Sequence, residues 1–251
     1  MNRAVRVGHI ALSFHEATAE QVELVLRSHG HAIERHTAPH GQMFAALGRG
    51  EIDILVSAWL PFSHGRYLTD LDTDVRIVTV LYEPYPIWGV PDYVPAEVAS
   101  IADLLASPAI DQMERLIQGM APGAGISEMS PHAIHEYGLG AAGYHFEHGT
   151  EDLCIRRFVD AVHERRWVVM PFWHPHALHR HYRIRRLQDP LLTLGGTDNA
   201  CVLVRRGSDD LIGVDALADL AQLHLGNTLV GELDDKLRQR SSNAYPRFSA
   251  I

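Results

Sequence analysis

The sequence predicts an α/β protein built from two lobes. Apolar runs with strand character alternate with helical patterns, and the connections between them are short. The alternation begins again near residue 84, and a last strand-like run near the C-terminus can rejoin the first block. We therefore expect one lobe made of residues 1–84 and 196–251 and a second made of residues 85–195, linked by two chain crossings.

The first block alternates strands and helices in regular order. Its third strand-like run is almost continuously apolar, as parallel strands covered on both faces are. The helix before Gly30 repeats apolar residues at helical spacing, and glycine commonly follows the last turn of a helix. The expected strands are residues 5–12, 32–35 and 51–56, and the expected helices are residues 16–29 and 43–47.

The second block is less regular because prolines interrupt it. Pro84 and Pro86 follow the strand expected at residues 75–81, and Ser100 with Asp103 has the spacing of a capping box. The tail from Ser241 is expected to be loose. The remaining expected strands are residues 167–170 and 201–204, and the remaining helices are residues 126–137, 150–165, 214–224 and 228–238.

Composition excludes several classes of function. The 251 residues include 22 Lys and Arg against 31 Asp and Glu, a net charge of -9, which disfavours nucleic acid as a partner. No run reaches the roughly 18 apolar residues of a membrane span, so direct membrane insertion is not expected. No signal peptide is evident, and the protein would be cytoplasmic if Met1 is the native start. Cys154 and Cys201 are expected to be unpaired thiols.

Three aromatic residues follow three predicted strands. Phe14, Trp59 and Trp173 come after the strands that begin near residues 5, 51 and 167. Ligands of parallel sheets bind beyond the carboxyl ends of the strands, so these side chains can face a ligand. An aromatic face attracts a cation, and a quaternary ammonium suits a cage of such faces because it has no N–H to satisfy. Each ring alone could equally be a core residue.

A second candidate feature is the small-residue segment before the helix expected at residues 126–137. The backbone N–H groups of Gly125 and Ile126 would stand at the N-terminus of that helix, which favours an anion such as a carboxylate. An ordinary turn is the alternative. His64, five residues after Trp59, could donate to the same carboxylate or could be a surface histidine.

Four histidines lie within eight residues, which raises the question of a metal site. A zinc site needs a supporting set of ligands in defined geometry, and the acidic residues and thiols of this chain form no recognisable motif with these histidines. We therefore expect solvated or ligand-adjacent histidines, no metal site and no cofactor. The four are His174, His176, His179 and His181.

Several blocks together resemble the glycine betaine-binding proteins of osmoprotectant ABC importers. The segment Ala58-Trp59-Leu60-Pro61 with His64 is similar to a ligand-binding segment of that family. Pro122-Gly123-Ala124-Gly125-Ile126 and Trp173-His174-Pro175-His176 resemble two others. The joint occurrence of the Trp-Leu-Pro block at residues 59–61 and the Trp-His-Pro-His block at residues 173–176 is fairly specific to this family. The resemblance covers nearly the whole chain in separated stretches.

This resemblance implies a type II periplasmic-binding-protein fold with a ligand cleft between the lobes. It implies that Phe14, Trp59 and Trp173 surround a trimethylammonium group. It also implies that Gly125, Ile126 and His64 hold the carboxylate of the same ligand. The family commonly has a third tryptophan where this chain has Phe14, and a smaller ring leaves more room for the ligand.

The resulting expectation is a substrate-binding protein, not an enzyme. Its partners would be a small quaternary ammonium zwitterion of the glycine betaine type and the membrane subunits of an ABC transporter. A cytoplasmic ligand sensor or storage protein on the same fold is the alternative. A hydrolase that uses the histidine cluster is a third reading, and no nucleophile–base pair, carboxylate dyad or phosphate loop in the sequence supports it.

Overall fold

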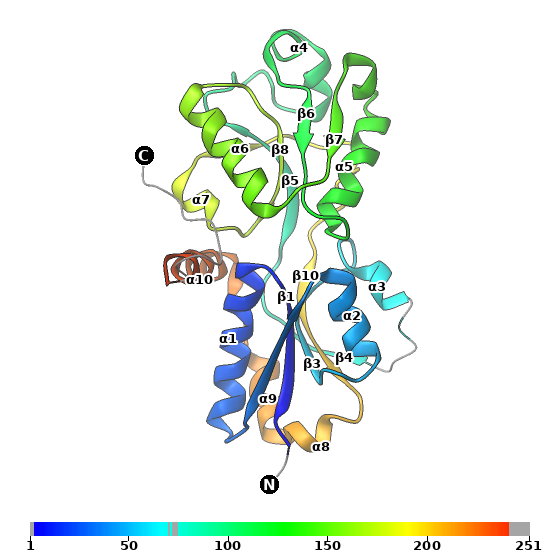
Figure 1. Ribbon diagram of the computed structural model, residues 1–251, viewed down its shortest axis with the longest axis vertical. Helices are drawn as coiled ribbons and strands as arrows, with labels where there is room; N and C mark the ends of the chain where they lie inside the picture. Colours follow the sequence, from blue (N-terminus) through cyan, green and yellow to red (C-terminus); the bar gives the residue numbers. More distant parts are fainter. Residues whose placement is uncertain (1–2, 70, 72–74, 241–251) are drawn as a thin grey trace. The chain divides into compact units, whose positions relative to one another are not determined.

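The computed structural model describes residues 3–69, 71 and 75–240 (Figure 1). The tail expected to be loose from Ser241 lies outside the described residues. The described chain divides into two compact units. Unit 1 contains residues 3–84 and 197–240, and unit 2 contains residues 85–196. The chain therefore passes from one unit to the other near Pro84 and returns near Thr197.

Unit 1 is a five-stranded sheet with the strand order β2-β1-β3-β10-β4. Strand β1 is parallel to β2 and β3, whereas β10 is antiparallel to both of its neighbours. The C-terminal part of the chain thus supplies a strand inside the sheet. The strands are β1 (Val5–Ile10), β2 (Ile33–Ala38), β3 (Ile54–Leu60), β4 (Val75–Val80) and β10 (Asn199–Arg205).

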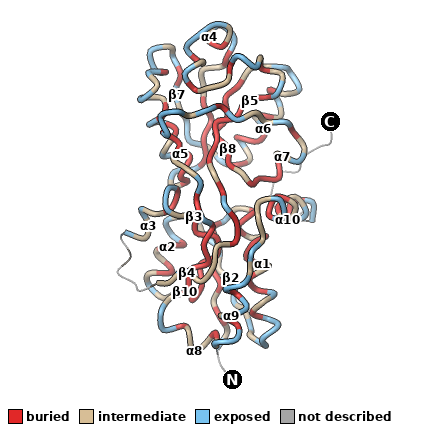
Figure 2. The backbone as a smooth tube through the Cα atoms, turned by 180° about the vertical axis from the view of Figure 1, so that it is seen from behind, coloured by how far each residue is buried: buried red, intermediate tan, exposed pale blue. Residues whose placement is uncertain are grey.

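Helices cover both faces of the unit 1 sheet. Helix α2 packs on one face, and α1 packs on the other together with α9 and α10 (Figure 1). The buried residues of the sheet lie mainly in the central strands β1, β3 and β10, and the outer sides of the helices are exposed (Figure 2). The helices of this unit are α1 (Ser13–Ser28), α2 (His40–Gly48), α3 (Gly65–Thr69), α8 (Asp209–Ile212), α9 (Val214–Gln222) and α10 (Gly226–Arg240).

Unit 2 contains two small sheets. One has the order β8-β5-β9, with β5 antiparallel to both neighbours, and the other pairs β6 with β7 in parallel. The strands are β5 (Tyr85–Pro91), β6 (Leu116–Gln118), β7 (His145–Glu147), β8 (Met170–His174) and β9 (Ile184–Arg186). The helices are η1 (Ile101–Leu105), α4 (Ala109–Gln112), α5 (Gly125–Glu136), η2 (Leu139–Ala142), α6 (Glu151–Glu164) and α7 (Leu178–His181).

Several sequence expectations shift by a few residues in the structure. Helix α1 begins at Ser13 and not at residue 16, so Phe14 lies in its first turn. Strand β3 runs on to Leu60 and β8 to His174, so Trp59 and Trp173 lie inside strands and do not follow them. The capping box at Ser100 and Asp103 is present, but it begins a 3-10 helix.

Strand β5 is absent from the sequence expectations. Pro86 argues against a strand because proline cannot donate to the sheet. In the structure it is paired with Trp173 of β8 in the central strand of the sheet, and β9 is aligned only with Gly89–Pro91. Pro86 therefore has a paired strand on one side only, β8, which reduces the free-energy cost of its missing backbone N–H. No helix of the described chain is long and apolar enough to cross a membrane.

Candidate functional site

The candidate site residues of unit 1 gather in one aromatic cluster. The ring centroids of Phe14 and Trp59 are 5.3 Å apart, and those of Trp59 and His64 are 6.0 Å apart in a stacked arrangement. All three side chains are at least 94% buried. The structure thus brings together the first turn of α1, the end of β3 and the loop that follows β3. We call Phe14, His15, Trp59 and His64 the unit 1 cluster.

A bulge in β3 places Trp59. Cys201 of β10 is paired with Ala58, but Leu203 is paired with Leu55, so two residues of β3 oppose one residue of β10. Ser57, one of the two, has a φ of 64°, which is uncommon for a residue with a side chain. Such a bulge bends a strand and re-aims the side chains that follow it. Nothing in the sequence marks it, which is why the predicted strand stops short of Trp59.

Hydrogen bonds fix the indole of Trp59. Its Nε1 donates to the Tyr82 hydroxyl at 2.9 Å and to Ser57 Oγ at 3.2 Å, and these two oxygens are 2.6 Å apart. Burial raises the pKa of Tyr82, so its hydroxyl keeps its proton at neutral pH. The indole N–H is therefore held by neutral partners, and the ring makes aromatic contacts with Phe14 and His64.

The proton position on His64 follows from a backbone contact. The backbone N–H of Trp59 donates to His64 Nδ1 at 2.9 Å, so a neutral His64 carries its proton on Nε2. Burial lowers the pKa of His64 well below its ordinary value, and the imidazole is neutral at pH 7. His64 therefore has one N–H, on Nε2, to offer as a donor.

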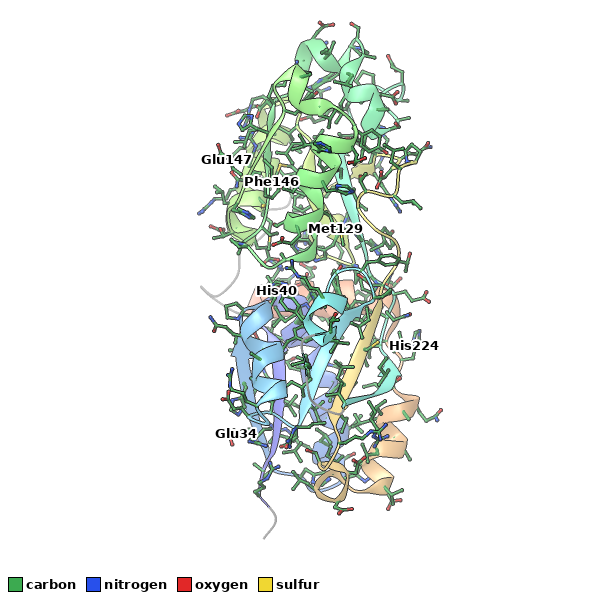
Figure 3. The ribbon with its side chains drawn as sticks, turned by 90° about the vertical axis from the view of Figure 1, so that its right-hand side faces the viewer. Glu34, His40, Met129, Phe146, Glu147 and His224 are labelled. Atoms are coloured by element: carbon green, nitrogen blue, oxygen red, sulfur yellow. The ribbon has the colours of Figure 1, made fainter. Side chains whose placement is uncertain are left out.

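Two further histidines, which the sequence expectations did not include, belong to this region. His15 is 1% exposed, with its ring centroid 4.4 Å from Phe14 and 5.7 Å from Trp59. His40 is the first residue of α2 and lies at the end of unit 1 where α3 also lies (Figure 3). Its ring centroid is 5.3 Å from that of His64. Burial lowers the pKa of His15 well below its ordinary value and that of His40 to about 4.

A buried carboxylate holds the loop between Trp59 and His64. Asp198, fully buried at the start of the return segment, accepts hydrogen bonds from the backbone N–H groups of Phe62 at 2.6 Å and Ser63 at 3.1 Å. It also accepts one from Ser63 Oγ at 2.6 Å. These three hydrogen bonds fix the short segment between Trp59 and His64, two of the candidate site residues.

In unit 2, the predicted anion site lies at the N-terminus of α5. Gly123 has a φ of +96°, a conformation that favours glycine, and Ala124 precedes the first helical residue. The backbone N–H groups of Gly125 and Ile126 make no hydrogen bond within the described residues. Ser127 follows them with a buried Oγ that has no hydrogen-bond partner among the described residues. Two N–H donors and one hydroxyl are thus available there.

Trp173 lies in β8, the strand against which α5 packs. Its ring meets the ring of His176 edge-on, with centroids 4.9 Å apart. The backbone N–H of Leu178 donates to His176 Nδ1 at 3.0 Å, so the Nε2–H of a neutral His176 faces Glu151 Oε1 at 3.0 Å. The Glu151 carboxylate therefore fixes the orientation of the His176 imidazole, which packs edge-on with the Trp173 ring.

Two other histidines of the predicted cluster, His174 and His179, make local contacts. His179 Nε2 lies 3.0 Å from the Trp173 carbonyl oxygen, and burial lowers the pKa of His179 to about 4. The ring of His174 stacks on Tyr85. Within the described residues no group of three His, Cys, Asp or Glu side chains is placed to hold a metal ion.

A surface groove of about 670 Å³ lies apart from these residues, along α1 and α10. Its lining mixes acidic and basic side chains, among them Glu20, Arg27 and Lys236, and includes no member of the unit 1 cluster. The groove therefore lies outside the candidate site described above.

Comparisons with known proteins identify the family and the fold. One curated relative is the glycine betaine/carnitine transport binding protein GbuC of Listeria monocytogenes, 26% identical over 97 residues, which span 39% of this chain and 32% of GbuC. The solved structure of the glycine betaine/L-proline-binding protein ProX from Borrelia burgdorferi matches with a TM-score of 0.83 at 26% identity, covering 97% of this chain and 90% of that one.

Lactococcal OpuAC in its closed-liganded conformation with glycine betaine matches with a TM-score of 0.79 at 19% identity and shows the same two-lobed fold. It covers 97% of this chain and 98% of that one. The family model described as "Substrate binding domain of ABC-type glycine betaine transport system" matches residues 3–245. Because that match spans nearly the whole sequence, the chain belongs to the family of substrate-binding domains of ABC-type glycine betaine transport systems.

Proposed function

We propose that this chain binds glycine betaine or a related quaternary ammonium zwitterion and delivers it to the membrane subunits of an ABC transporter. The observation that carries this proposal is the unit 1 cluster, in which Phe14, Trp59 and His64 pack together as buried aromatic rings in a chain of this family. A quaternary ammonium group needs such faces because it can form no hydrogen bond.

The neutrality of the imidazoles supports binding of a cation. A protonated ring beside Trp59 would repel a trimethylammonium group, and burial keeps His15 and His64 uncharged at pH 7. The unit 1 cluster therefore presents π faces without positive charge. Trp173 of unit 2 adds a further aromatic face to the proposed ligand contacts.

In this proposal the carboxylate of the ligand accepts hydrogen bonds from donors of Gly125, Ile126 and His64. Gly125 and Ile126 offer backbone N–H groups at the N-terminus of α5, where the helix dipole favours a negative charge. His64 offers Nε2–H, because its Nδ1 is engaged by the backbone. Hydrogen bonds to a charged group contribute about 1.5–3 kcal/mol each, so this recognition favours a zwitterion over a simple cation.

We further propose that the chain acts as a binder and catalyses no reaction. Burial raises the pKa of the Cys154 thiol to about 12 and that of Cys201 to about 11, so neither provides a thiolate at neutral pH. His176, the buried histidine paired with a carboxylate, uses Nδ1 for a backbone bond and Nε2 for Glu151, so neither ring nitrogen is left to act as a general base. Membership in a transport family favours delivery over a sensor or storage role.

Calorimetry with glycine betaine tests the proposal. Trp59→Ala and Trp173→Ala should each weaken binding by about 1–3 kcal/mol, since each removes a cation–π partner and its packing. Trp167→Ala, a matched change at a partly buried tryptophan outside the candidate site, should leave the affinity within about twofold. Wild-type affinity in both of the first two variants would refute the assignment of these rings.

A second comparison tests the carboxylate contacts through the ligand. Choline keeps the trimethylammonium group but carries a hydroxyl in place of the carboxylate. It should bind at least about tenfold more weakly than glycine betaine, because it gives the α5 N-terminus no negative charge. His64→Ala should reduce the ratio of the glycine betaine affinity to the choline affinity. Equal affinities in the wild-type protein would contradict the carboxylate assignment.

A further inference from the structure

A buried carboxylate of α10 contacts the first turn of α1, next to the unit 1 cluster. The two helices pack against each other, and the hydroxyl of Ser13, the first residue of α1, donates to Asp234 Oδ1 of α10. Both residues are completely buried. Phe14 directly follows Ser13, and its ring centroid lies 5.3 Å from that of Trp59. Asp234 therefore holds the turn of helix that carries one of the clustered rings.

The sequence of α1 does not supply its own N-cap. Leu12 occupies the position where Ser, Thr, Asp or Asn commonly accepts a hydrogen bond from the helix, and a leucine side chain cannot accept one. The N-terminus of a helix carries a partial positive charge, which a nearby carboxylate stabilises. Asp234 brings such a carboxylate to Ser13 from a distant part of the chain. The first turn of α1 thus depends on α10 for an acceptor that its own N-cap residue lacks.

Arg238 pairs with the same carboxylate. Its Nε lies 2.9 Å from Asp234 Oδ1, the oxygen that also accepts from Ser13, and at most 1% of either charged side chain is exposed. A buried ion pair adds little net stability because both charges lose their hydration, so fixing one arrangement of the two helices is the effect to expect of it. The guanidinium offsets the charge of Asp234, which leaves little direct attraction for a cationic ligand. Asp234 therefore acts on the unit 1 cluster through geometry.

The charge of Asp234 also reaches the hydrogen-bond partner of Trp59. Burial above all, and Asp234 to a smaller extent, raise the pKa of Tyr82. The Tyr82 hydroxyl accepts from Trp59 Nε1 at 2.9 Å. Asp234 thus influences both sides of the contact between Phe14 and Trp59.

We propose that Asp234 is a positioning residue for onium binding, which fixes the first turn of α1 through Ser13 and so sets the placement of Phe14 against Trp59. This inference rests on the proposed function, in which the rings of the unit 1 cluster contact the onium group. Asp234 itself does not touch the ligand. Its removal should therefore weaken binding only while the Phe14 ring is present.

A double-mutant cycle, measured by calorimetry with glycine betaine, tests the inference. Ser13→Ala removes the hydroxyl but leaves Asp234 paired with Arg238, so the variant should fold and bind about three- to tenfold more weakly than the wild-type protein. In a Phe14→Ala background the same change should alter the affinity by less than about twofold, because the ring that Ser13 positions is gone. Asp234→Asn should weaken binding at least as much as Ser13→Ala does, and the Ser13 cycle decides the question if that variant does not fold.

Ser28→Ala, the same substitution at the exposed last residue of α1, is the matched control and should leave the affinity within about twofold. Chemical denaturation establishes that each variant is folded at the temperature of the titration. Wild-type affinity in Ser13→Ala would overturn the inference. An equal fold loss with and without the Phe14 ring would also overturn it, because it would show a general effect on the fold, and the proposed function would stand. If the wild-type protein binds no onium compound, the proposed function fails and the positioning role with it.

Discussion

Trp59 owes its orientation to polar neighbours as well as to packing. Its indole N–H donates to the hydroxyl oxygens of Tyr82 and Ser57, and its backbone N–H donates to His64 Nδ1. One residue thus couples the end of β3 to the imidazole proposed to hold the carboxylate. The sequence alone pointed to Trp59 and His64 as candidate site residues, and the structure brings their rings together. It did not point to His15, because the contacts of His15 with Phe14 and Trp59 depend on the first turn of α1, which begins at Ser13.

Phe14 is the position where a single substitution should change ligand preference. Phe14→Trp brings a larger ring with a stronger quadrupole to the unit 1 cluster, so it should bind glycine betaine about three- to tenfold more tightly. The same ring occupies space that a longer betaine needs, so carnitine should bind more weakly. Calorimetry with both ligands measures the change, and a thermal melt confirms that the variant is folded. An unaltered ranking would mean that Phe14 does not contact the ligand.

The buried imidazoles predict a loss of stability in acid. The pKa of His15 and His64 lies well below 6.5 in the folded protein, because burial disfavours the charged ring. Below pH 6.5 the unfolded chain binds protons that the folded chain does not, so the free energy of unfolding falls as the pH falls. Each ring therefore contributes to a loss of stability that grows as the pH falls below 6.5.

Urea unfolding at pH 7 and pH 5 measures this effect. In His15→Phe the loss of stability between the two pH values should be smaller than in the wild-type protein, because one titrating ring is gone. An identical loss in the two proteins would show that His15 binds a proton equally well when folded and unfolded.

At the level of elements, the loop between β3 and α3 depends on a carboxylate far away in the sequence. Asp198 accepts two backbone N–H bonds and one hydroxyl bond from Phe62 and Ser63. Burial raises its pKa, although these donors favour the charged form. The loop connects Trp59 to His64, so its geometry sets the spacing of the two site residues.

Asp198→Asn should therefore weaken both stability and ligand binding. The amide N–H₂ would face donors where the carboxylate oxygens accept, which should cost about 2–4 kcal/mol of unfolding free energy and several-fold in affinity. Chemical denaturation and calorimetry measure the two effects. Asp219→Asn, on the exposed side of α9, is the control and should change neither by more than about 0.5 kcal/mol. A variant of Asp198 with wild-type values would show that the loop holds its shape unaided.

The elements that the sequence predicted well have strong periodic patterns, and those it missed are governed by tertiary contacts. Helix α6 begins beside Thr150 as expected, and its Thr150 side chain accepts from the Leu153 backbone N–H. Strand β5 was missed because Pro86 contradicts strand propensity, and only its pairing with β8 and β9 makes it a strand. The bulge at Ser57 was missed because its cause lies in β10, which comes much later in the sequence.

For the whole molecule, the central expectation is that residues of both units contact one ligand. Glycine betaine should slow amide hydrogen exchange in the segment from Trp59 to His64 of unit 1 and in the first turn of α5 in unit 2. Hydrogen-exchange mass spectrometry with and without ligand measures both segments in one experiment. Protection of only one of them would contradict the assignment of Gly125 and Ile126, or of Trp59 and His64, to the same ligand.

The place of β10 in unit 1 has a consequence for synthesis on the ribosome. Residues 3–84 supply β1 to β4, but β10 lies between β3 and β4 and comes from residues 199–205. As the chain emerges, β3 and β4 have no partner on their inner edges until more than a hundred further residues have been translated. The described part of unit 2 is one continuous stretch, residues 85–196, and can complete its sheets first. Unit 2 can thus fold before unit 1 is complete, and until β10 is translated the inner edges of β3 and β4 are open to pairing with other chains.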